Sequence, residues 1–169
     1  RAGGWTGGGF PRHMAPGGGK PKGGPMRRWG EPPEDGRRYL PRPGAYAVLL
    51  RAGDILLTLQ EDGGEGRPEV QLPGGGLDPG ESPLRALHRE VREETGWSLA
   101  SPRRLLTYRR YRFMPEYGLW ADKVCHLYLA RPARPLGPPT EPGHQPLWAP
   151  LAAAPGLLAN PAEAAAVAG

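Results

Sequence analysis

Residues 75–97 read GGLDPGESPLRALHREVREETGW, and they contain a helix whose two ends carry recognisable signals. Ser82 is a favoured N-cap residue, Pro83 suits the first helical position, and Gly96 suits the position just past the last turn. Three apolar residues recur at helical spacing and share one face: Leu84, Leu87 and Val91. We expect this helix to pack that face against a sheet.

The other face of the helix is acidic near its C-terminal end. Three carboxylates lie within about one turn of each other: Glu90, Glu93 and Glu94. The helix dipole presents negative charge there, so each carboxylate costs roughly 0.3–1 kcal/mol. A divalent cation bound to oxygen ligands would compensate this cost, which indicates a functional site. Taken alone, three glutamates favour a simpler alternative, a solvated face whose repulsion is relieved by three arginines: Arg85, Arg89 and Arg92.

The whole stretch resembles the Nudix box, which is a glycine and a glutamate followed by Arg-Glu-aliphatic-x-Glu-Glu-x-Gly-aliphatic. Seven residues match this pattern in identity and spacing: Gly75, Glu81, Arg89, Glu90, Glu93, Glu94 and Gly96. Seven fixed residues at fixed spacing occur by chance at a frequency on the order of 10⁻⁹ per starting position. Trp97 departs from the pattern, where an aliphatic residue is expected, and this bears on core shape more than on chemistry.

The resemblance implies hydrolysis at phosphorus with bound Mg²⁺, for which Mn²⁺ is an expected substitute. Glu90 and Glu94 would be the principal metal ligands. Glu93 would be an additional ligand or the base for the attacking water, and Arg89 would orient the glutamates by ion pairing. The implied catalytic set therefore contains all three glutamates and the arginine.

The loop before the helix is expected to complete this site. Glu81 would brace the loop and contact the metal through water. Gly75 and Gly76 would let the backbone approach the cation and the phosphates of the substrate, where a side chain would collide. Gly75 is thus expected both beside the metal and beside the substrate.

The flanking sequence predicts strands on both sides of this helix. The expected strands are residues 45–50 and 55–59, which form a hairpin, then 70–72, 104–113, 123–130 and a short one at 147–148. Asn160-Pro161 predicts the start of a terminal helix that runs to Val167. The pattern predicts an α/β (α+β) fold with a mixed β-sheet. The resemblance implies the α/β/α sandwich of Nudix proteins.

Composition divides the 169 residues into a tail and one domain. Residues 1–36 contain 12 Gly and 6 Pro, which predicts a disordered tail, and residues 37–169 are expected to form the Nudix hydrolase domain. An alternative is a polyanion-binding arm built on the basic residues of the tail: Lys20, Lys22, Arg27 and Arg28.

The charge and the cysteine content limit which binding partners and which cellular compartment are expected. The net charge is +5, of which residues 37–169 carry only +2 (sixteen basic against fourteen acidic residues), so a nucleic acid partner is not favoured and no membrane is expected. Cys125 is the single cysteine, which excludes an internal disulfide and favours the cytoplasm. We expect Cys125 to be a small buried side chain and His88 and His126 to be structural. A monomer or a homodimer is expected.

Two further features lie outside the box. Residues 108–112 interleave tyrosine and arginine, which suggests substrate binding by Tyr108 and Arg110 through base stacking and phosphate contact. A strand with packed tyrosines and solvated arginines explains the pattern equally well. A base for the attacking water is expected on a loop, either Glu141 in a proline-stiffened loop or Glu116 in a turn, and we favour Glu141. A solvated loop glutamate with no catalytic role explains Glu141 equally well.

Three functions fit the sequence. The first is a pyrophosphohydrolase that cleaves the diphosphate linkage of a nucleoside diphosphate joined to another moiety, such as ADP-ribose or a dinucleoside polyphosphate. The second is removal of pyrophosphate from nucleoside triphosphates or RNA 5′ ends. The third is a non-catalytic ligand sensor, against which the intact acidic box argues.

Overall fold

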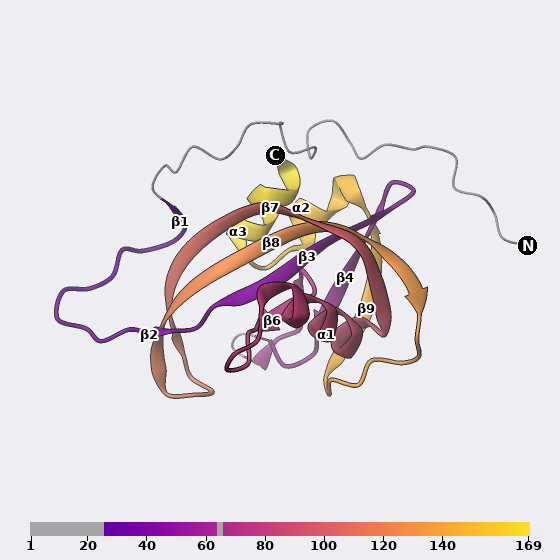
Figure 1. The fold of residues 1–169 in the computed structure, drawn as a ribbon. Coiled ribbons are helices and arrows are strands. Elements are labelled where there is room, and N and C mark those ends of the chain that lie inside the picture. The colour runs from indigo at the N-terminus through magenta and orange to yellow at the C-terminus, as the bar shows by residue number, and fades with distance from the viewer. Residues whose placement is uncertain (1–25, 64–65) are drawn as a thin grey trace, which may run out of the picture.

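The computed structural model describes residues 26–63 and 66–169, which form one sheet with helices on both faces (Figure 1). The strands are β1 (Arg27–Arg28), β2 (Leu40–Pro41), β3 (Gly44–Arg51), β4 (Asp54–Gln60), β5 (Glu69–Gln71), β6 (Gly74–Gly76), β7 (Trp97–Met114), β8 (Leu119–Pro135) and β9 (His144–Pro150). The helices are α1 (Pro83–Thr95), the 3-10 helix η3 (Leu151–Ala153), α2 (Ala154–Leu157) and α3 (Pro161–Ala168).

The sheet is mixed, as the sequence predicts. Its main order is β1-β7-β8-β3-β4-β5, while β2 pairs with β8, β6 with β3 and β9 with β4. β3 lies parallel to β8 and antiparallel to β4 and β6. β7 and β8 form a long antiparallel hairpin, seen in Figure 1 as two arching ribbons. The expected hairpin between residues 45 and 59 is confirmed.

Strand β3 is buried from Gly44 to Leu50 because helices cover both faces of the sheet. Successive side chains of a strand point to opposite faces. Ala45, Ala47 and Leu49 accordingly join the core cluster that contains α1. Their neighbours Tyr46, Val48 and Leu50 join the cluster that contains α3. The predicted α/β/α layering is therefore confirmed.

Helix α1 is capped as its sequence predicts. Ser82 Oγ accepts a hydrogen bond from Arg85 N (3.3 Å), and Gly96 adopts a left-handed conformation with φ 74°. Leu84 is a correction: it is 44% exposed and lies outside both core clusters. Since Leu84 belongs to the first turn, the apolar face that contacts the sheet begins one half-turn later, with Ala86 and Leu87.

The expected limit of the tail at residue 36 is also corrected. Arg27 and Arg28 pair with Tyr108 and Arg109 of β7, and Trp29 packs against the α3-side core. Residues 27–29 therefore belong to the folded domain, because an aromatic ring supplies apolar area that the glycine-rich residues lack. Residues 1–25 lie outside the described residues. In the part of the chain that is described, no helix is long and apolar enough to cross a membrane.

Candidate active site

Arg89 lies at the centre of the acidic cluster on α1. Its Nε and Nη2 each donate to Glu81 (both 2.9 Å), and Nη1 donates to Glu90 Oε1 (2.8 Å) and Glu93 Oε2 (3.2 Å). Nη2 also donates to the carbonyl of Gly76 (3.1 Å). One planar guanidinium thus fixes three carboxylates and the loop that precedes the helix, as the ion-pairing role expected for Arg89 requires.

Strand β6 brings backbone against two of the glutamates. Gly74 N donates to Glu94 Oε2 (3.0 Å). A Cβ atom on Gly75 would lie 2.7 Å from Cδ and Oε1 of Glu90, closer than real atoms approach. By contrast, a Cβ on Gly76 would meet only Pro43 O at 3.9 Å. Within the protein itself, the lack of a side chain is therefore required at Gly75, where Glu90 approaches, and not at Gly76; the approach of both glycines to a cation and phosphates stays a prediction.

Glu81 closes the loop between β6 and α1. It accepts a hydrogen bond from Asp78 N (2.9 Å) in addition to the two from Arg89. These bonds, with that to the Arg89 side chain the largest cause, lower the pKa of Glu81 to about 2. Glu81 is thus anionic at neutral pH and braces the loop.

A second loop, between β8 and β9, is held against the C-terminal end of α1. Thr140 N and Glu141 N both donate to the carbonyl of Glu93 (2.8 and 2.9 Å). The carbonyl of Gly96 accepts from Leu136 N (2.7 Å), so both ends of the loop are attached to the helix end. These bonds satisfy helix carbonyls that have no partner within the helix.

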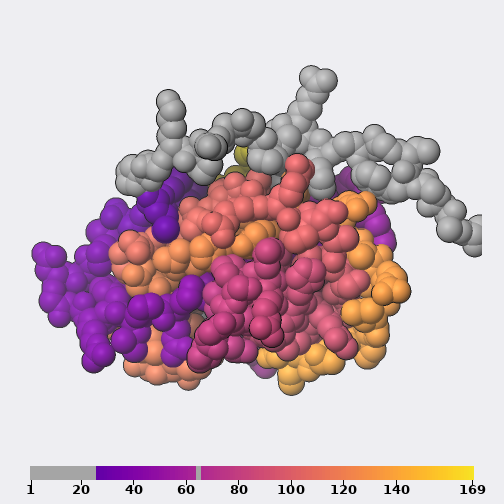
Figure 2. Space-filling view, viewed as in Figure 1, coloured from indigo at the N-terminus to yellow at the C-terminus, as the bar shows by residue number. Residues whose placement is uncertain are grey.

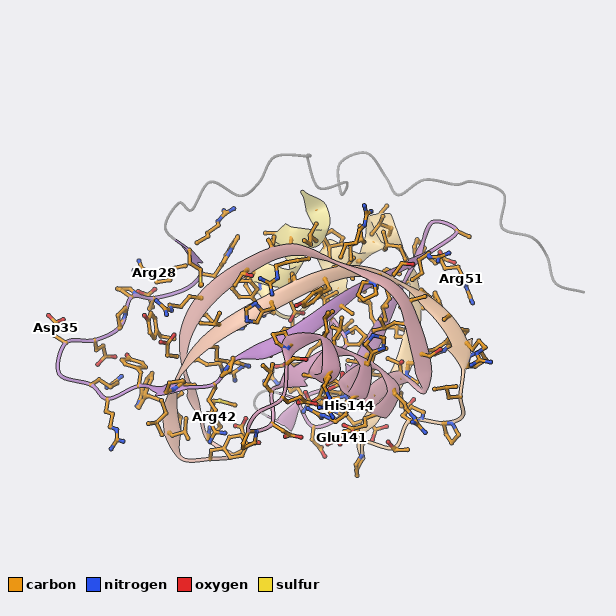
Figure 3. All side chains as sticks on the ribbon, viewed as in Figure 1. Arg28, Asp35, Arg42, Arg51, Glu141 and His144 are labelled. Carbon is orange, nitrogen blue, oxygen red and sulfur yellow. The ribbon has the colours of Figure 1, made fainter. Side chains whose placement is uncertain are left out.

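The two candidate loop carboxylates are placed differently. Glu141 lies close enough to Glu90 and Glu94 for its charge to raise the pKa of both. Figure 3 shows Glu141 beside His144 at the lower end of α1. Glu116 is exposed in the turn between β7 and β8, and Figure 1 shows this turn at the lower left. The geometry brings Glu141 to the cluster and leaves Glu116 outside it.

The site also contains His144, which the sequence analysis missed. His144 Nδ1 lies 3.6 Å from Glu94 Oε1 and is hydrogen-bonded to Thr58 Oγ1 (3.1 Å). The His144 and Glu94 side chains are 9% and 8% exposed. Burial lowers the pKa of His144, opposed by the Glu141 charge, so the imidazole is neutral at pH 7. No local signal marks His144, because its position depends on the pairing of β9 with β4.

Burial governs the charge state of the central carboxylates. It raises the pKa of Glu94 well above its ordinary value, although the hydrogen bond from Gly74 opposes this. It also raises the pKa of Glu90, opposed by Arg89. Three glutamates and a loop glutamate therefore share one helix end with a single arginine between them, a concentration of negative charge that a cation would stabilise.

The donor set suits a hard divalent cation. All the candidate ligands are oxygen atoms, from carboxylates and from the backbone carbonyl of Gly75, and such ligands suit Mg²⁺ or Mn²⁺. Over residues 26–63 and 66–169, no group of three or more His, Cys, Asp or Glu side chains already surrounds one point. Arg89 lies among the glutamates instead and balances part of their charge.

The expected substrate residues on β7 differ in their placement. Tyr108 is 1% exposed, and its hydroxyl accepts a hydrogen bond from Asn160 Nδ2 (3.2 Å). It is a core residue, so the expectation that it stacks on a base is corrected. The reason is that Tyr108 packs in the core cluster that contains α3, whereas Arg110, two positions further along the same face, is half-buried and lines a cavity.

Of the three residues expected to be structural, Cys125 and His126 take such positions and His88 does not. Cys125 is 1% exposed, and burial raises the pKa of its thiol. His126 Nδ1 is hydrogen-bonded to Thr107 Oγ1 (3.3 Å) across the β7–β8 hairpin. His88 is exposed on α1 and lines a shallow hollow with Arg92 and Glu93 on the outer side of the helix.

In the space-filling view α1 lies at the front of the molecule, bordered by the orange surface of the chain after β8 (Figure 2).

Comparison with known proteins agrees with this geometry. The family model described as NUDIX domain matches residues 40–167. A Bacillus subtilis protein named putative 8-oxo-dGTP diphosphatase is 38% identical over 82 residues, which are 48% of this chain and 52% of that protein. The ADP-ribose pyrophosphatase of Bacillus subtilis is 32% identical over 96 residues, 56% of this chain and 49% of that protein. The chain thus spans about half the length of these curated relatives.

A solved structure shares the fold over most of this chain. The MutT NUDIX hydrolase from Burkholderia pseudomallei superposes with a TM-score of 0.58 at 28% identity, covering 76% of this chain and 97% of that one. The residues matched by the family model, 40–167, include α1 and its acidic cluster.

Proposed function

Given that this chain belongs to the NUDIX domain family, we propose that it hydrolyses the diphosphate linkage of a nucleoside diphosphate joined to another moiety. The ADP-ribose pyrophosphatase among its relatives supports this substrate class. The observation that carries the proposal is the group of buried and half-buried carboxylates at the end of α1, in which Arg89 holds Glu90 and Glu93 and the β6 backbone holds Glu94.

Five residues would hold a divalent cation in this site: Glu90, Glu94, Glu93, Gly75 and Glu81. The cation, Mg²⁺ or Mn²⁺ in its place, would neutralise the diphosphate and make a bound water nucleophilic. Glu94 keeps Oε1 directed toward a neutral His144 at 3.6 Å, and Glu90 Oε2 accepts no hydrogen bond that the described residues provide. These oxygens are available as ligands.

The chain's own side chains have distinct roles in the proposed reaction. Arg89 orients Glu90 and Glu93, and His144 with Thr58 positions Glu94. Glu141 accepts the proton of the attacking water. The water oxygen bonds to phosphorus while the bridging phosphorus–oxygen bond breaks, and the leaving phosphate keeps the electron pair. Because Glu141 N is anchored to the carbonyl of Glu93, its carboxylate is held near the cluster at low entropic cost.

A second candidate is removal of pyrophosphate from a nucleoside triphosphate or an RNA 5′ end. The relative named putative 8-oxo-dGTP diphosphatase favours it, and so does the run of arginines at positions 109, 110 and 112 on β7. Both candidates require the same carboxylates, since each cleaves a phosphoric anhydride.

A substrate panel tests the proposal. ADP-ribose, diadenosine polyphosphates, oxidised dNTPs and 5′-triphosphate RNA would each be incubated with the protein and Mg²⁺, and phosphate-containing products separated by ion-exchange chromatography. We expect turnover of ADP-ribose or a dinucleoside polyphosphate that stops when chelator is in excess. Turnover confined to triphosphates would favour the second candidate. Tight binding without turnover of any compound would indicate a ligand sensor and contradict the proposal.

A further inference from the structure

A cavity of about 310 Å³ lies on the α3 side of the sheet, on the opposite face from the α1 core. Three basic side chains from the β7–β8 hairpin line it: Arg110, Arg112 and Lys123. Arg110 pairs with Lys123 across the hairpin, and Arg112 lies two positions along β7 on the same face. The three cations therefore form one wall of the cavity.

These cations lack carboxylate partners. Within the described residues, no ion pair joins Arg110, Arg112 or Lys123 to an acidic group within 4.0 Å. Lys123 Nζ donates to the hydroxyl of Tyr46 (3.0 Å). Burial lowers the pKa of Lys123, and the charges of Arg112 and Arg110 lower it further. By contrast, Arg109 on the other face of β7 forms an ion pair, with its Nε 3.0 Å from Asp122 Oδ1.

Two carboxylates face the same cavity and are already engaged. Glu163 is 3% exposed and accepts hydrogen bonds from Leu72 N (3.0 Å) and Asn160 Nδ2 (3.3 Å). Glu69 accepts from Gln71 Nε2 (3.1 Å). Burial raises the pKa of Glu163 to about 7, and the charges of Arg110 and Lys123 oppose this, so Glu163 offsets part of the positive charge of the wall without forming an ion pair within 4.0 Å in the described residues.

The lining favours a charged group over a flat base. The only aromatic ring in the wall is that of Tyr46, which is 9% exposed, and the apolar contribution is limited to Ala159 and Pro161. A base bound by stacking needs an exposed aromatic face, whereas a phosphate needs convergent cationic donors. Two guanidinium groups and one ammonium group provide such donors.

The cavity adjoins the loop before α1 at Lys123. This residue also lines a second hollow, which is formed by the loop of residues 76–81 before α1 together with Arg42 and Tyr117. The loop carries Glu81 and the Gly76 carbonyl that Arg89 binds. A ligand that extends along Lys123 can therefore contact the loop at one end and the Arg110 wall at the other.

We propose that Arg110, Arg112 and Lys123 bind a second phosphate of the substrate, carried on the ribose of a nucleotide whose diphosphate lies at the α1 carboxylates. The inference rests on the proposed function for the position of the diphosphate. It narrows the substrate class to nucleotides phosphorylated on the ribose as well as at the 5′ position. A free 2′- or 3′-phosphate and the first internal phosphate of a polynucleotide share this chemistry.

Binding measurements with Mg²⁺ present test the assignment, because the cation holds the 5′-phosphate at the α1 carboxylates and none of the ligands contains an anhydride to cleave. The affinities of AMP, adenosine 2′,5′-bisphosphate, adenosine 3′,5′-bisphosphate and the dinucleotide pApA would be compared by isothermal titration calorimetry. Because a charge-assisted hydrogen bond is worth roughly a factor of ten or more, we expect at least one doubly phosphorylated ligand to bind about tenfold more tightly than AMP. If only pApA binds more tightly than AMP, the ligand is the end of a polynucleotide. If only a bisphosphate binds more tightly, the ligand is a small nucleotide.

Matched variants test whether the arginines of this wall cause the gain in affinity. Arg110→Gln and Arg112→Gln should each abolish most of the advantage over AMP while leaving AMP affinity unchanged, and Arg110→Lys should retain part of it. Arg109→Gln removes the same charge from the opposite face of β7 and should keep the full advantage. Equal affinities for all four ligands, or equal loss in Arg109→Gln, would overturn the assignment. Since the assay needs no turnover, its result is independent of whether the protein hydrolyses anhydrides.

Discussion

Arg89 shows at the scale of single residues why the acidic cluster is stable without bound metal. Its guanidinium donates to Glu81, Glu90 and Glu93 and to the Gly76 carbonyl. A lysine at this position would present one point charge and could not reach these acceptors in one plane. The carboxylates are thus oriented before substrate arrives, and only part of their charge is neutralised.

Gly75 is the residue at which backbone and carboxylate approach most closely. Gly75→Ala would place a Cβ 2.7 Å from Cδ of Glu90 and displace that side chain. Because small displacements of a catalytic group can reduce rates by about 10²-fold, we expect kcat/KM to fall at least tenfold. The melting temperature should change little, since the displaced atoms are the far end of a side chain.

Gly156→Ala is the matched control for this substitution. A Cβ on Gly156 meets no atom within 4 Å, so activity and melting temperature should both stay near wild type. Steady-state kinetics and thermal denaturation of the two variants side by side check the prediction. An unchanged kcat/KM in Gly75→Ala would show that the position of Glu90 does not limit the reaction.

The grouping of Glu90, Glu93 and Glu94 could be predicted from the sequence, because a period of 3.6 residues brings them within one turn of the helix. The ion-pairing role of Arg89 and the bracing role of Glu81 come from the resemblance to the Nudix box. His144 could not be predicted, because it reaches Glu94 only through the pairing of β9 with β4. Tyr108 was assigned wrongly, since composition alone does not show which positions of β7 face the core.

At the scale of elements, the loop between β8 and β9 and the end of α1 form one unit. Gly96 ends the helix at φ 74°, and a Cβ there would lie 2.0 Å from the carbonyl oxygen of Gly137. The loop can therefore lie against the helix end only because residue 96 is glycine. This contact brings Glu141 to the carboxylate cluster.

Glu141→Gln tests the function of that loop. A base acts in the transition state, so its loss should lower kcat and kcat/KM together, by roughly 10²–10⁴. Glu116→Gln, in the turn of the β7–β8 hairpin, should remain within a few-fold of wild type. If Glu116→Gln loses activity and Glu141→Gln does not, the hairpin supplies the base. If neither changes the kinetics, the α1 glutamates activate water without a loop carboxylate.

Elements with a strong local pattern could be predicted, and those that depend on a partner could not. The sequence indicates α1, α3 and the β3–β4 hairpin through caps and short apolar runs. Strands β1, β2 and β6 are two or three residues long, and their sequences, Arg-Arg, Leu-Pro and Gly-Gly-Gly, are too short and too poor in β-branched residues to carry a strand signal. β7 extends from Trp97, seven residues before its predicted start, because β8 continues to pair with it through three register shifts.

At the scale of the whole molecule, residues 72–74 connect the two faces of the sheet. Leu72 N donates to Glu163 on α3, and Gly74 N donates to Glu94 on α1. Two buried carboxylates on opposite faces are thus held by one short segment. The α1 face carries the proposed chemistry, and the α3 face carries the cavity proposed for a second phosphate.

Glu163 makes the stability of the whole domain depend on pH. Burial raises its pKa from 4.5 to about 7. Folding therefore favours its neutral form, which contributes stability that is fully present below pH 4.5 and is lost as pH rises through 7. The contribution is on the order of 3 kcal/mol for a shift of this size.

Comparing wild type with Glu163→Gln isolates the contribution of this carboxyl group to stability. The free energy of unfolding of wild type minus that of the variant, measured by urea denaturation at pH 4.5, 6, 7 and 8, should decrease as pH rises. The variant loses one acceptor, so it should be the less stable protein at pH 4.5 and approach or exceed wild type at pH 8. A difference that stays constant over this range would show that Glu163 has an ordinary pKa.

The central claim is that a divalent cation held by the α1 carboxylates drives hydrolysis, and Glu94→Gln tests it most directly. The amide keeps the shape of the side chain and an acceptor for Gly74 N, but it loses the charge that binds the cation. The measurement is the rate of hydrolysis of the best panel substrate at saturating Mg²⁺, for wild type and variant, with wild type in excess chelator beside them. We predict that the variant and the chelated enzyme both lose activity by orders of magnitude, while the variant melts at or above the wild-type temperature because a buried charge is removed. Full turnover by the folded variant, or by wild type in excess chelator, would contradict the account.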